Sequence, residues 1–260
     1  MRSWIGWIGS LLVLAGCARE PSATPEEIRA RGELVVGTEA EFHPFEYRTE
    51  DGEYTGFDID LARLIAEELG VKLRIENMKF AGLIPSLDTG RIDIIMSGMT
   101  ATDERRKSIA FSAPYFLTGL CLLVNTERAD DVTDWKALND PSRTVVVKTA
   151  TTSDTFVREN LPKAKRVTLE TENDCALEVA TGRADAFIYD QLSIQRHHEE
   201  HPDTTRAHLT PITREPYSIG VRQNDEELRA FLDAFLAKLR TDGRFARLVD
   251  KHGLPVSDEE

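Results

Sequence analysis

Short apolar runs with the character of buried strands alternate with runs of helical spacing, and this alternation occurs twice along the 260-residue chain. The first round starts at residues 33–37 and reaches 92–98, and the second extends from 120 to 190. Strands that alternate with helices predict parallel sheets, so two rounds predict two α/β lobes in one chain. A different C-terminal part follows, with one strand at 217–222 and helices at 226–240 and 243–252.

The stretch GFDIDLARLIAEELG, residues 56–70, predicts a helix that packs against a sheet. Asp58 and Asp60 fall where this helix begins, and acids there commonly accept bonds from unpaired backbone N–H groups. We therefore expect both carboxylates to cap the helix and not to catalyse. Gly70 is expected to end it. Its apolar stripe consists of Leu61, Leu64, Ile65 and Leu69.

The overall charge excludes one class of partner. The formal net charge is −13, whereas a nucleic-acid-binding protein needs a basic face. Apolar residues make up 41% of the chain, which is enough for a real core. We therefore expect a globular protein that does not bind nucleic acid.

The N-terminus has the pattern of an export signal: Arg2, then an apolar run from residue 4 to 14, then small residues. The signal peptide is predicted to cover residues 1–16. The run ends in LAGC, which resembles the lipobox of bacterial lipoproteins, so Cys17 is expected to carry the lipid and 17–27 to form a tether. An ordinary signal peptide with a nearby cysteine is the alternative. No second long apolar run follows, so we expect a lipid anchor at the bacterial cell envelope, in the periplasm or on the outer face of the membrane.

The remaining cysteines and the histidines have plain structural interpretations. An exported compartment permits a disulfide between Cys121 and Cys175, but both lie in apolar runs, so buried free thiols are expected. His197 and His201 are four residues apart, a spacing that suits zinc. Pro202 follows at once and no third ligand is evident, so we expect a solvated helix end and no metal.

In open parallel sheets, ligands bind beyond the carboxyl ends of the strands. The residues at these positions combine one cation, acids, hydroxyls and aromatic rings, a set that suits a small zwitterion. They are Glu39 and Phe42 after the first strand, Ser97, Gly98, Thr100 and Arg105 after the third, Lys148, Thr151 and Thr152 in the second lobe, and Asp190 after its last parallel strand.

Several segments match one family's pattern in order: PFEY, GFDIDLARLIAEEL, GLIPSLDTGRIDIIMSGMTATDERR, TGRADAFIYD and LRTDGRFARLVDKHG. Together they resemble the family-three extracytoplasmic solute-binding proteins of ABC importers for polar amino acids, over nearly the whole mature chain. The resemblance implies a two-lobe, type II periplasmic-binding-protein-like fold with a ligand cleft and two hinge crossings. Lobe 1 would comprise 28–115 and 218–260, lobe 2 would comprise 120–213, and the hinges would lie near 116–119 and 214–217.

The same resemblance implies a role for each site residue. Arg105 would grip the α-carboxylate of an amino acid, and Asp190 would hold its α-ammonium. The rest of the site would be Gly98 and Thr100 on the α-groups, Thr152 with its backbone N–H on the carboxylate, Ser97 and Thr151 beside them, Phe42 and Phe80 around the side chain, and Glu39, Lys148 and Tyr189 at its tip.

Some of these residues also have purely structural interpretations. Asp190 can cap the following helix, Thr151 and Thr152 can cap theirs, and the two phenylalanines can belong to the core. Position 39 usually carries a shorter acid in such proteins. Glu39 favours a basic or amide tip, and Lys148 can pair with Glu39 and cancel that preference.

The expected function is the extracytoplasmic binding component of an ABC amino-acid importer, which binds a free polar L-amino acid, basic or amide, and delivers it to a membrane permease. We expect a monomer without a cofactor. One alternative is a dehydratase of prephenate or arogenate type on the same scaffold. Asp190 argues against a prephenate-type substrate, because a partner for an ammonium group is useless for a ligand that lacks one. A sensory ectodomain is the other, and no second membrane segment or signalling domain supports it. No catalytic motif is present in the sequence.

Overall fold

The computed structural model describes residues 22–255. The predicted signal peptide, Cys17 and the first part of the predicted tether lie outside this range. Within it, none of the helices has the length and apolar character needed to cross a membrane.

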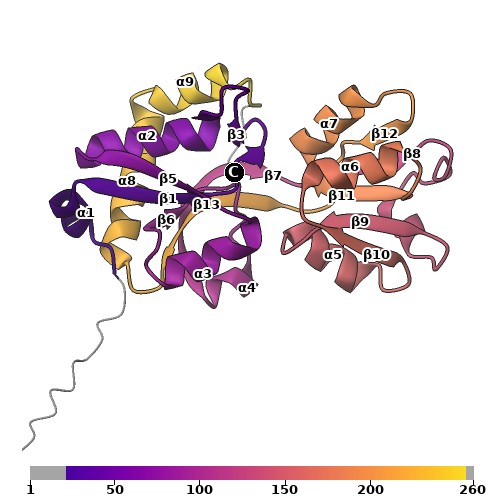
Figure 1. Ribbon diagram of the computed structural model, residues 1–260, viewed down its shortest axis with the longest axis horizontal. Helices are drawn as coiled ribbons and strands as arrows, with labels where there is room; N and C mark the ends of the chain where they lie inside the picture. Colours follow the sequence, from indigo (N-terminus) through magenta and orange to yellow (C-terminus); the bar gives the residue numbers. More distant parts are fainter. Residues whose placement is uncertain (1–21, 256–260) are drawn as a thin grey trace, which may run out of the picture.

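Two five-stranded sheets form the centres of two lobes (Figure 1). In the first sheet the strand order is β5-β1-β6-β13-β7, with β1 parallel to both β5 and β6 and with β13 antiparallel to β6 and β7. The strands are β1 (Glu33–Thr38), β5 (Lys72–Asn77), β6 (Ile94–Ile95), β7 (Ile109–Thr118) and β13 (Glu215–Arg222). The helices of this lobe are α1 (Pro25–Arg31), α2 (Phe57–Leu69), α3 (Leu83–Asp88), α4 (Asp103–Arg106), α8 (Glu226–Thr241) and α9 (Arg244–Lys251), with a short 3-10 helix η1 (Phe80–Gly82) before α3.

In the second sheet the order is β10-β9-β11-β8-β12, and β9 is parallel to both β10 and β11. The strands are β8 (Leu120–Asn125), β9 (Thr144–Lys148), β10 (Lys165–Leu169), β11 (Ala186–Asp190) and β12 (Thr205–His208). The helices are α5 (Thr152–Asn160), α6 (Glu172–Ala180) and α7 (Gln191–Glu200), with a short 3-10 helix η2 (Trp135–Leu138). The predicted βαβ rhythm therefore appears in both lobes.

A small three-stranded sheet extends the first lobe toward the second. It contains β2 (Glu41–Phe42), β3 (Glu46–Arg48) and β4 (Tyr54–Thr55), all antiparallel. Strands this short carry almost no period-two signal, so the sequence did not predict them.

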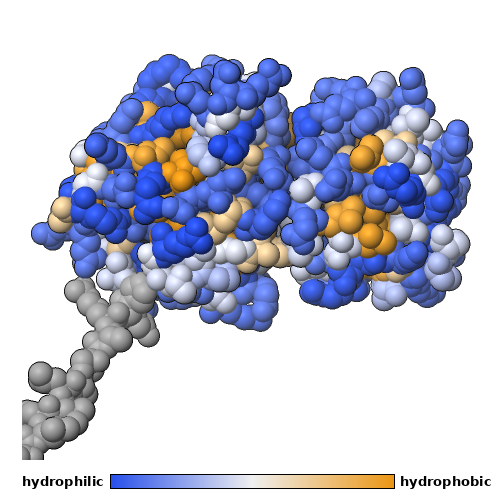
Figure 2. All heavy atoms as spheres, viewed as in Figure 1, coloured by the Kyte–Doolittle hydropathy of each residue, from blue (hydrophilic) through white to orange (hydrophobic). Residues whose placement is uncertain are grey.

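Two strands connect the lobes. β7 and β13 run side by side from the first sheet toward the second lobe (Figure 1), and their pairing extends to Thr118 opposite Glu215. Directly beyond, the Leu120 N–H donates to Thr213 Oγ1 over 3.0 Å. Gly119 approaches the Thr213 carbonyl so closely that a Cβ would collide with it, so only glycine fits there. The face in Figure 2 is mainly hydrophilic, as the 30% of charged residues leads one to expect.

The capping role predicted for the two acids of α2 is wrong. The N-cap residue is Gly56, with φ +119°, and no side chain of the described chain caps this helix. Asp58 and Asp60 bond elsewhere: Asp58 accepts from the Gly98 N–H and the Tyr115 hydroxyl, and Asp60 pairs with basic residues of α2 and the C-terminal part. Gly70 ends the helix in the left-handed conformation, as predicted.

The cysteine and histidine expectations had mixed outcomes. Cys121 and Cys175 are buried free thiols, as expected. His197 is not solvated: its side chain is 1% exposed, and Nδ1 lies 3.1 Å from Glu200 Oε2. Within residues 22–255, no three metal-ligating side chains come together. The helix α1 also begins at Pro25, inside the segment predicted to be tether.

Candidate ligand-binding site

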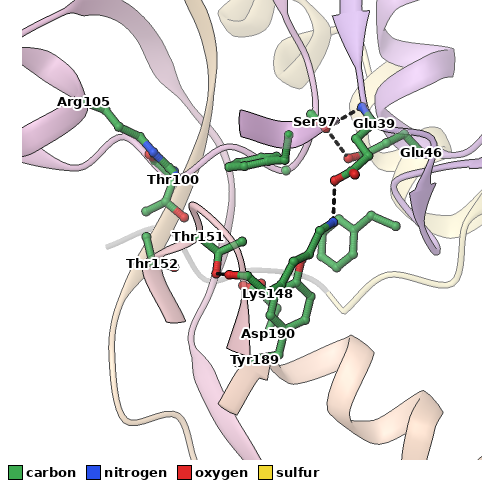
Figure 3. A pocket seen from close by; sticks show the side chains of 13 residues that line it. Glu39, Glu46, Ser97, Thr100, Arg105, Lys148, Thr151, Thr152, Tyr189 and Asp190 are labelled. Carbon is green, nitrogen blue, oxygen red and sulfur yellow. Dashed lines mark hydrogen bonds and ion pairs between the residues drawn. The ribbon is translucent and has the colours of Figure 1, made fainter. Parts of the chain in front are cut away.

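A cavity between the lobes is lined by thirteen residues, and all twelve ligand-binding residues predicted from the sequence are among them (Figure 3). The first lobe contributes Glu39, Phe42, Glu46, Phe80, Ser97, Gly98, Thr100 and Arg105, and the second contributes Lys148, Thr151, Thr152, Tyr189 and Asp190. The geometry brings these residues together, and their contacts with a ligand remain a prediction.

Topology explains the convergence. Glu39 follows β1, Ser97 is the second residue after β6, Lys148 ends β9 and Asp190 ends β11. The carboxyl ends of parallel strands meet at one edge of a sheet. The two lobes turn these edges toward each other, so polar groups from distant parts of the chain share one cavity.

Arg105 lies at one end of the cavity, close to Thr100 (Figure 3). Its Nη1 donates to the Thr100 carbonyl over 2.9 Å, and its Nη2 donates to the Ala150 carbonyl of the other lobe over 3.2 Å. The guanidinium carbon stands 5.1 Å from the centre of the Phe80 ring. Burial lowers the pKa of Arg105 to about 10, so the guanidinium is charged at neutral pH. Part of the side chain still faces water.

Asp190 is a buried acid whose charge is not matched. It is the N-cap residue of α7, yet its side chain makes no capping bond within the described chain. Its Oδ1 is buried and lacks a hydrogen-bond partner among residues 22–255. Burial raises the pKa of Asp190 to about 7; the neighbouring Tyr217 hydroxyl offsets part of this rise, without reaching regular hydrogen-bond geometry. A buried unpaired acid is costly, and an ammonium group from a ligand would relieve that cost.

The N-terminus of α5 adds partial positive charge to the same wall. Thr151 is its N-cap residue, and its hydroxyl donates to the Lys148 carbonyl over 2.7 Å and accepts from the Asp154 N–H over 3.4 Å. Thr152 is the first helical residue. The first N–H groups of a helix favour anions, so this end of α5 suits a carboxylate.

An ion pair between the lobes occupies the other end of the cavity. Lys148 Nζ lies 2.5 Å from Glu39 Oε2, and both side chains are almost fully buried (Figure 3). The more exposed Lys79 approaches Glu39 Oε1 at 3.7 Å. The alternative raised by the sequence, in which Lys148 pairs with Glu39, is the arrangement found in this structure.

The aromatic residues are partly committed to packing. Phe42 is 5% exposed, and its ring centre lies 5.9 Å from that of Tyr189 in the other lobe and 5.2 Å from that of Phe45. Phe80 is only partly buried and has Arg105 on its ring, with Lys148 Nζ at 5.9 Å. Phe80 therefore has the more accessible ring face of the two.

Glu46 is the lining residue that sequence reasoning missed. It lies in β3, is 1% exposed, and accepts a bond from the Ser97 hydroxyl over 2.8 Å. Ser97 Oγ in turn accepts the Glu39 N–H over 3.0 Å. The available signal was an acid between Phe45 and Tyr47 in the segment PFEY, since a carboxylate inside an aromatic run calls for a partner.

Residues 34–255 match the family described as bacterial extracellular solute-binding proteins, family 3. The match covers most of the chain, so the protein belongs to this family. The predicted family and the two-lobe, type II fold are confirmed.

Individual relatives include both binding proteins and an enzyme. The L-cystine-binding protein TcyJ of Escherichia coli (strain K12) is 28% identical over 86% of this chain and 84% of its own. The cyclohexadienyl dehydratase of Pseudomonas aeruginosa is 29% identical over 81% and 79%. A crystal structure of an ancestral amino acid-binding protein, AncCDT-1, described as a precursor of cyclohexadienyl dehydratase, superposes with a TM-score of 0.81 at 39% identity and covers 88% of this chain and 99% of its own. AncCDT-1 is also described as a cationic amino acid solute-binding protein.

Proposed function

We propose that this protein is the extracytoplasmic substrate-binding component of an ABC importer. It binds a free polar L-amino acid and delivers it to the transmembrane subunits of a permease. The observation that carries the proposal is that Arg105 of one lobe and Asp190 of the other line a single cavity, with opposite charges. A zwitterion placed between them matches both.

The roles of the remaining groups follow from their places in the cavity. The α-carboxylate lies between Arg105 and the start of α5 at Thr152, where a planar guanidinium can make two parallel bonds. The α-ammonium meets Asp190, and Gly98 and Thr100 complete its surroundings. Ser97 and Thr151 hold this part of the wall in place through the bonds described above.

The far end of the cavity selects the side chain. Glu39 alone would favour a basic tip, but its ion pair with Lys148 leaves an acid and an ammonium that balance each other. A carboxamide can donate to the acid and accept from the ammonium, whereas a cationic tip has to compete with Lys148. Within the basic and amide ligands predicted, the ion pair therefore favours amides. Tyr189 and the partly buried Phe80 border the side chain.

A dehydratase is the second candidate, because cyclohexadienyl dehydratase shares the family scaffold. The buried unmatched acid at Asp190 favours binding, since an enzyme acting on prephenate has no ammonium to place there. A turnover assay with prephenate and arogenate separates the two. Product absorbance above the rate without protein would identify an enzyme, and its absence together with amino-acid binding would identify a binding protein.

The cellular arrangement belongs to the proposal as well. The exported chain is held at the envelope by a lipid on Cys17, and it acts as a monomer. Lobe 1 comprises 28–115 and 218–260, lobe 2 comprises 120–213, and the hinges lie near 116–119 and 214–217. The neighbouring course of β7 and β13 supports these hinge positions.

A thermal-shift screen of the twenty amino acids tests the binding function. A ligand that binds only the folded state adds about 2.7 kcal/mol of stability at a hundredfold excess over Kd. We expect glutamine or a basic amino acid to raise the unfolding temperature. If none of the twenty does, the proposed function is wrong.

A further inference from the structure

Two buried carboxyl groups lie at the floor of the cavity: Glu46 belongs to its lining, and Asp58 does not. Glu46 on β3 is 1% exposed and Asp58 on α2 is fully buried. One oxygen of each is satisfied: Glu46 Oε1 accepts from the Ser97 hydroxyl, and Asp58 Oδ2 accepts from the Gly98 N–H over 3.0 Å and the Tyr115 hydroxyl over 2.7 Å. The second oxygen of each, Glu46 Oε2 and Asp58 Oδ1, is buried and finds no donor anywhere in residues 22–255.

Among the residues that the structure describes, the surroundings offer no unengaged cation that would explain two ionised acids. The charged and titratable groups facing Glu46 are Asp58 of α2, Lys148 of β9 and Glu172 of α6, while Tyr115 of β7 faces Asp58. Lys148 is engaged by Glu39, and Glu172 is paired with Arg196. Glu46 and Asp58 act directly on each other, and two such carboxylates within a dry interior cannot both ionise without a large repulsion.

We propose that Glu46 Oε2 and Asp58 Oδ1 share one proton, and that this acid pair positions Ser97 and Gly98 at the floor of the ligand site. A protonated carboxyl donates one bond, so a single proton satisfies both oxygens. Glu46 is then a positioning residue that acts through Ser97, and Asp58 acts through the backbone of Gly98. Neither has to touch the ligand.

The segment that the pair holds has little freedom. Gly98 has φ +49°, and a Cβ there would lie 2.7 Å from the Phe42 ring. Ser97 also fixes the backbone of Glu39. Loss of the proton would leave two like charges under this segment, so the floor of the site would shift and ligand affinity would fall.

The pKa shifts of the two acids agree with this arrangement. Burial and the Asp58 charge raise the pKa of Glu46 well above its usual value, and burial raises the pKa of Asp58 to about 6. At pH values between the ordinary pKa of a carboxyl group and these raised pKa values, the folded state thus binds more protons than the unfolded state. By linkage, the contribution of this pair to stability falls as the pH rises through that range toward the folded pKa values.

Infrared spectroscopy of the full mature protein tests the shared proton. At about pH 8, above the pKa of Asp190 at about 7, the wild-type spectrum should contain the carbonyl stretch of a protonated carboxylic acid, and Glu46→Gln should lack it. Asp190→Asn should retain the band. Absence of the band in wild type, or its persistence in Glu46→Gln, would overturn the proposal. If Glu46→Gln does not fold, a pH titration of the wild-type spectrum replaces the comparison. A carbonyl band that is still present at about pH 8 supports the proposal, and a band that is lost below about pH 8 overturns it.

Ligand binding tests the positioning role. Glu46→Gln keeps an N–H donor for Asp58, so the best amino-acid ligand of the thermal-shift screen should bind within about threefold of wild type, or about 0.7 kcal/mol. Glu46→Leu removes the donor and should weaken binding more than about tenfold. A tenfold loss in Glu46→Gln would mean that the carboxylate itself contacts the ligand, and equal affinity in Glu46→Leu would mean that Glu46 positions nothing. Either result overturns this inference, whereas absence of binding in wild type would overturn the proposed function as well.

Discussion

At the scale of single residues, burial sets the charge on which ligand capture depends. Asp190 has a pKa of about 7 before ligand binds, and a bound ammonium would lower it. Binding below about pH 7 must then take place with release of a proton, so affinity should fall as the pH drops, by at most about tenfold per unit. Calorimetry in two buffers with different ionisation enthalpies measures both affinity and proton release. Constant affinity down to about pH 5, with no proton released, would contradict the role of Asp190.

Lys148 should decide between side-chain tips. Lys148→Met leaves Glu39 without its buried partner, so a ligand with a cationic tip should gain affinity relative to a ligand with a neutral tip. Arginine and citrulline are a matched pair, because they differ mainly in the charge at the tip. We expect the ratio of their affinities to move toward arginine by about tenfold or more, which corresponds to about 1.4 kcal/mol.

Calorimetric titration of both ligands into both proteins checks this expectation. Lys79→Met, which removes the exposed and more distant neighbour of Glu39, is the control and should leave the ratio nearly unchanged. An unaltered ratio in Lys148→Met would show that the ion pair does not select the ligand.

The residues found from sequence were those whose position follows from topology. Lys148 and Asp190 lie at the ends of strands, so the rule about strand ends located them, whereas Arg105, in α4, stood out through the family resemblance. Glu46 sits in a three-residue strand with no periodic signal, and its side chain bonds to Ser97, 51 residues further along the chain, which local sequence cannot show. Asp58 looked like a helix cap because local sequence cannot show that Gly98, forty residues away, needs its carboxylate.

At the scale of elements, the two lobes have the same arrangement at the start of a central strand: a buried aspartate that accepts a backbone N–H of a neighbouring strand. The segments TGRID and TGRAD precede β6 and β11. Asp93 accepts the Val35 N–H of β1 over 2.8 Å, and Asp185 accepts the Thr144 N–H of β9 over 2.8 Å. Each buried acid thus ties one parallel strand to its neighbour.

Removal of this tie should destabilise its lobe. Asp185→Ala leaves the Thr144 N–H without its acceptor and removes an ion-pair partner of two arginines, so the free energy of unfolding should fall by about 3 kcal/mol. Asp131→Ala removes an exposed partner of the same Arg143 and should cost less than about 1 kcal/mol. Urea denaturation measures both. Equal losses in the two variants would show that Asp185 acts only as a surface ion-pair partner.

Long elements were easier to predict than interrupted ones. The helix α8 shows a clear apolar stripe and appears within one residue of its predicted end. The strand β7 was missed because Pro114 interrupts it, and proline usually argues against a strand. The structure tolerates Pro114 because β7 is the edge strand of its sheet.

At the scale of the whole molecule, the lobes are attached to each other, and we propose that a lipid on Cys17 attaches the protein to the envelope. Cys17→Ser should abolish labelling by a fatty-acid probe and release the protein from the membrane fraction of a bacterial host. Fractionation with an antibody against the folded part measures the release. Wild-type protein that takes up no lipid label would show that Cys17 is not an anchor.

In this structure the lobes already touch across the cleft, through the Glu39–Lys148 ion pair and the bond from Arg105 to the Ala150 carbonyl. A ligand held by both lobes would add contacts that exist only when they are together, which is how binding favours closure. We therefore propose that an amino acid is held at its two ends by opposite lobes.

Calorimetry on Arg105→Ala and Asp190→Ala, with the ligand from the thermal-shift screen, tests this claim most directly. Removal of one partner of a buried charge pair costs roughly 3–5 kcal/mol, so each variant should lose on the order of a hundredfold or more in Kd while keeping its circular dichroism spectrum. Arg106→Ala, on the exposed neighbour of Arg105, should bind like wild type. If Arg105→Ala binds its amino acid within a few-fold of wild type, the amino acid is not held at its two ends by opposite lobes.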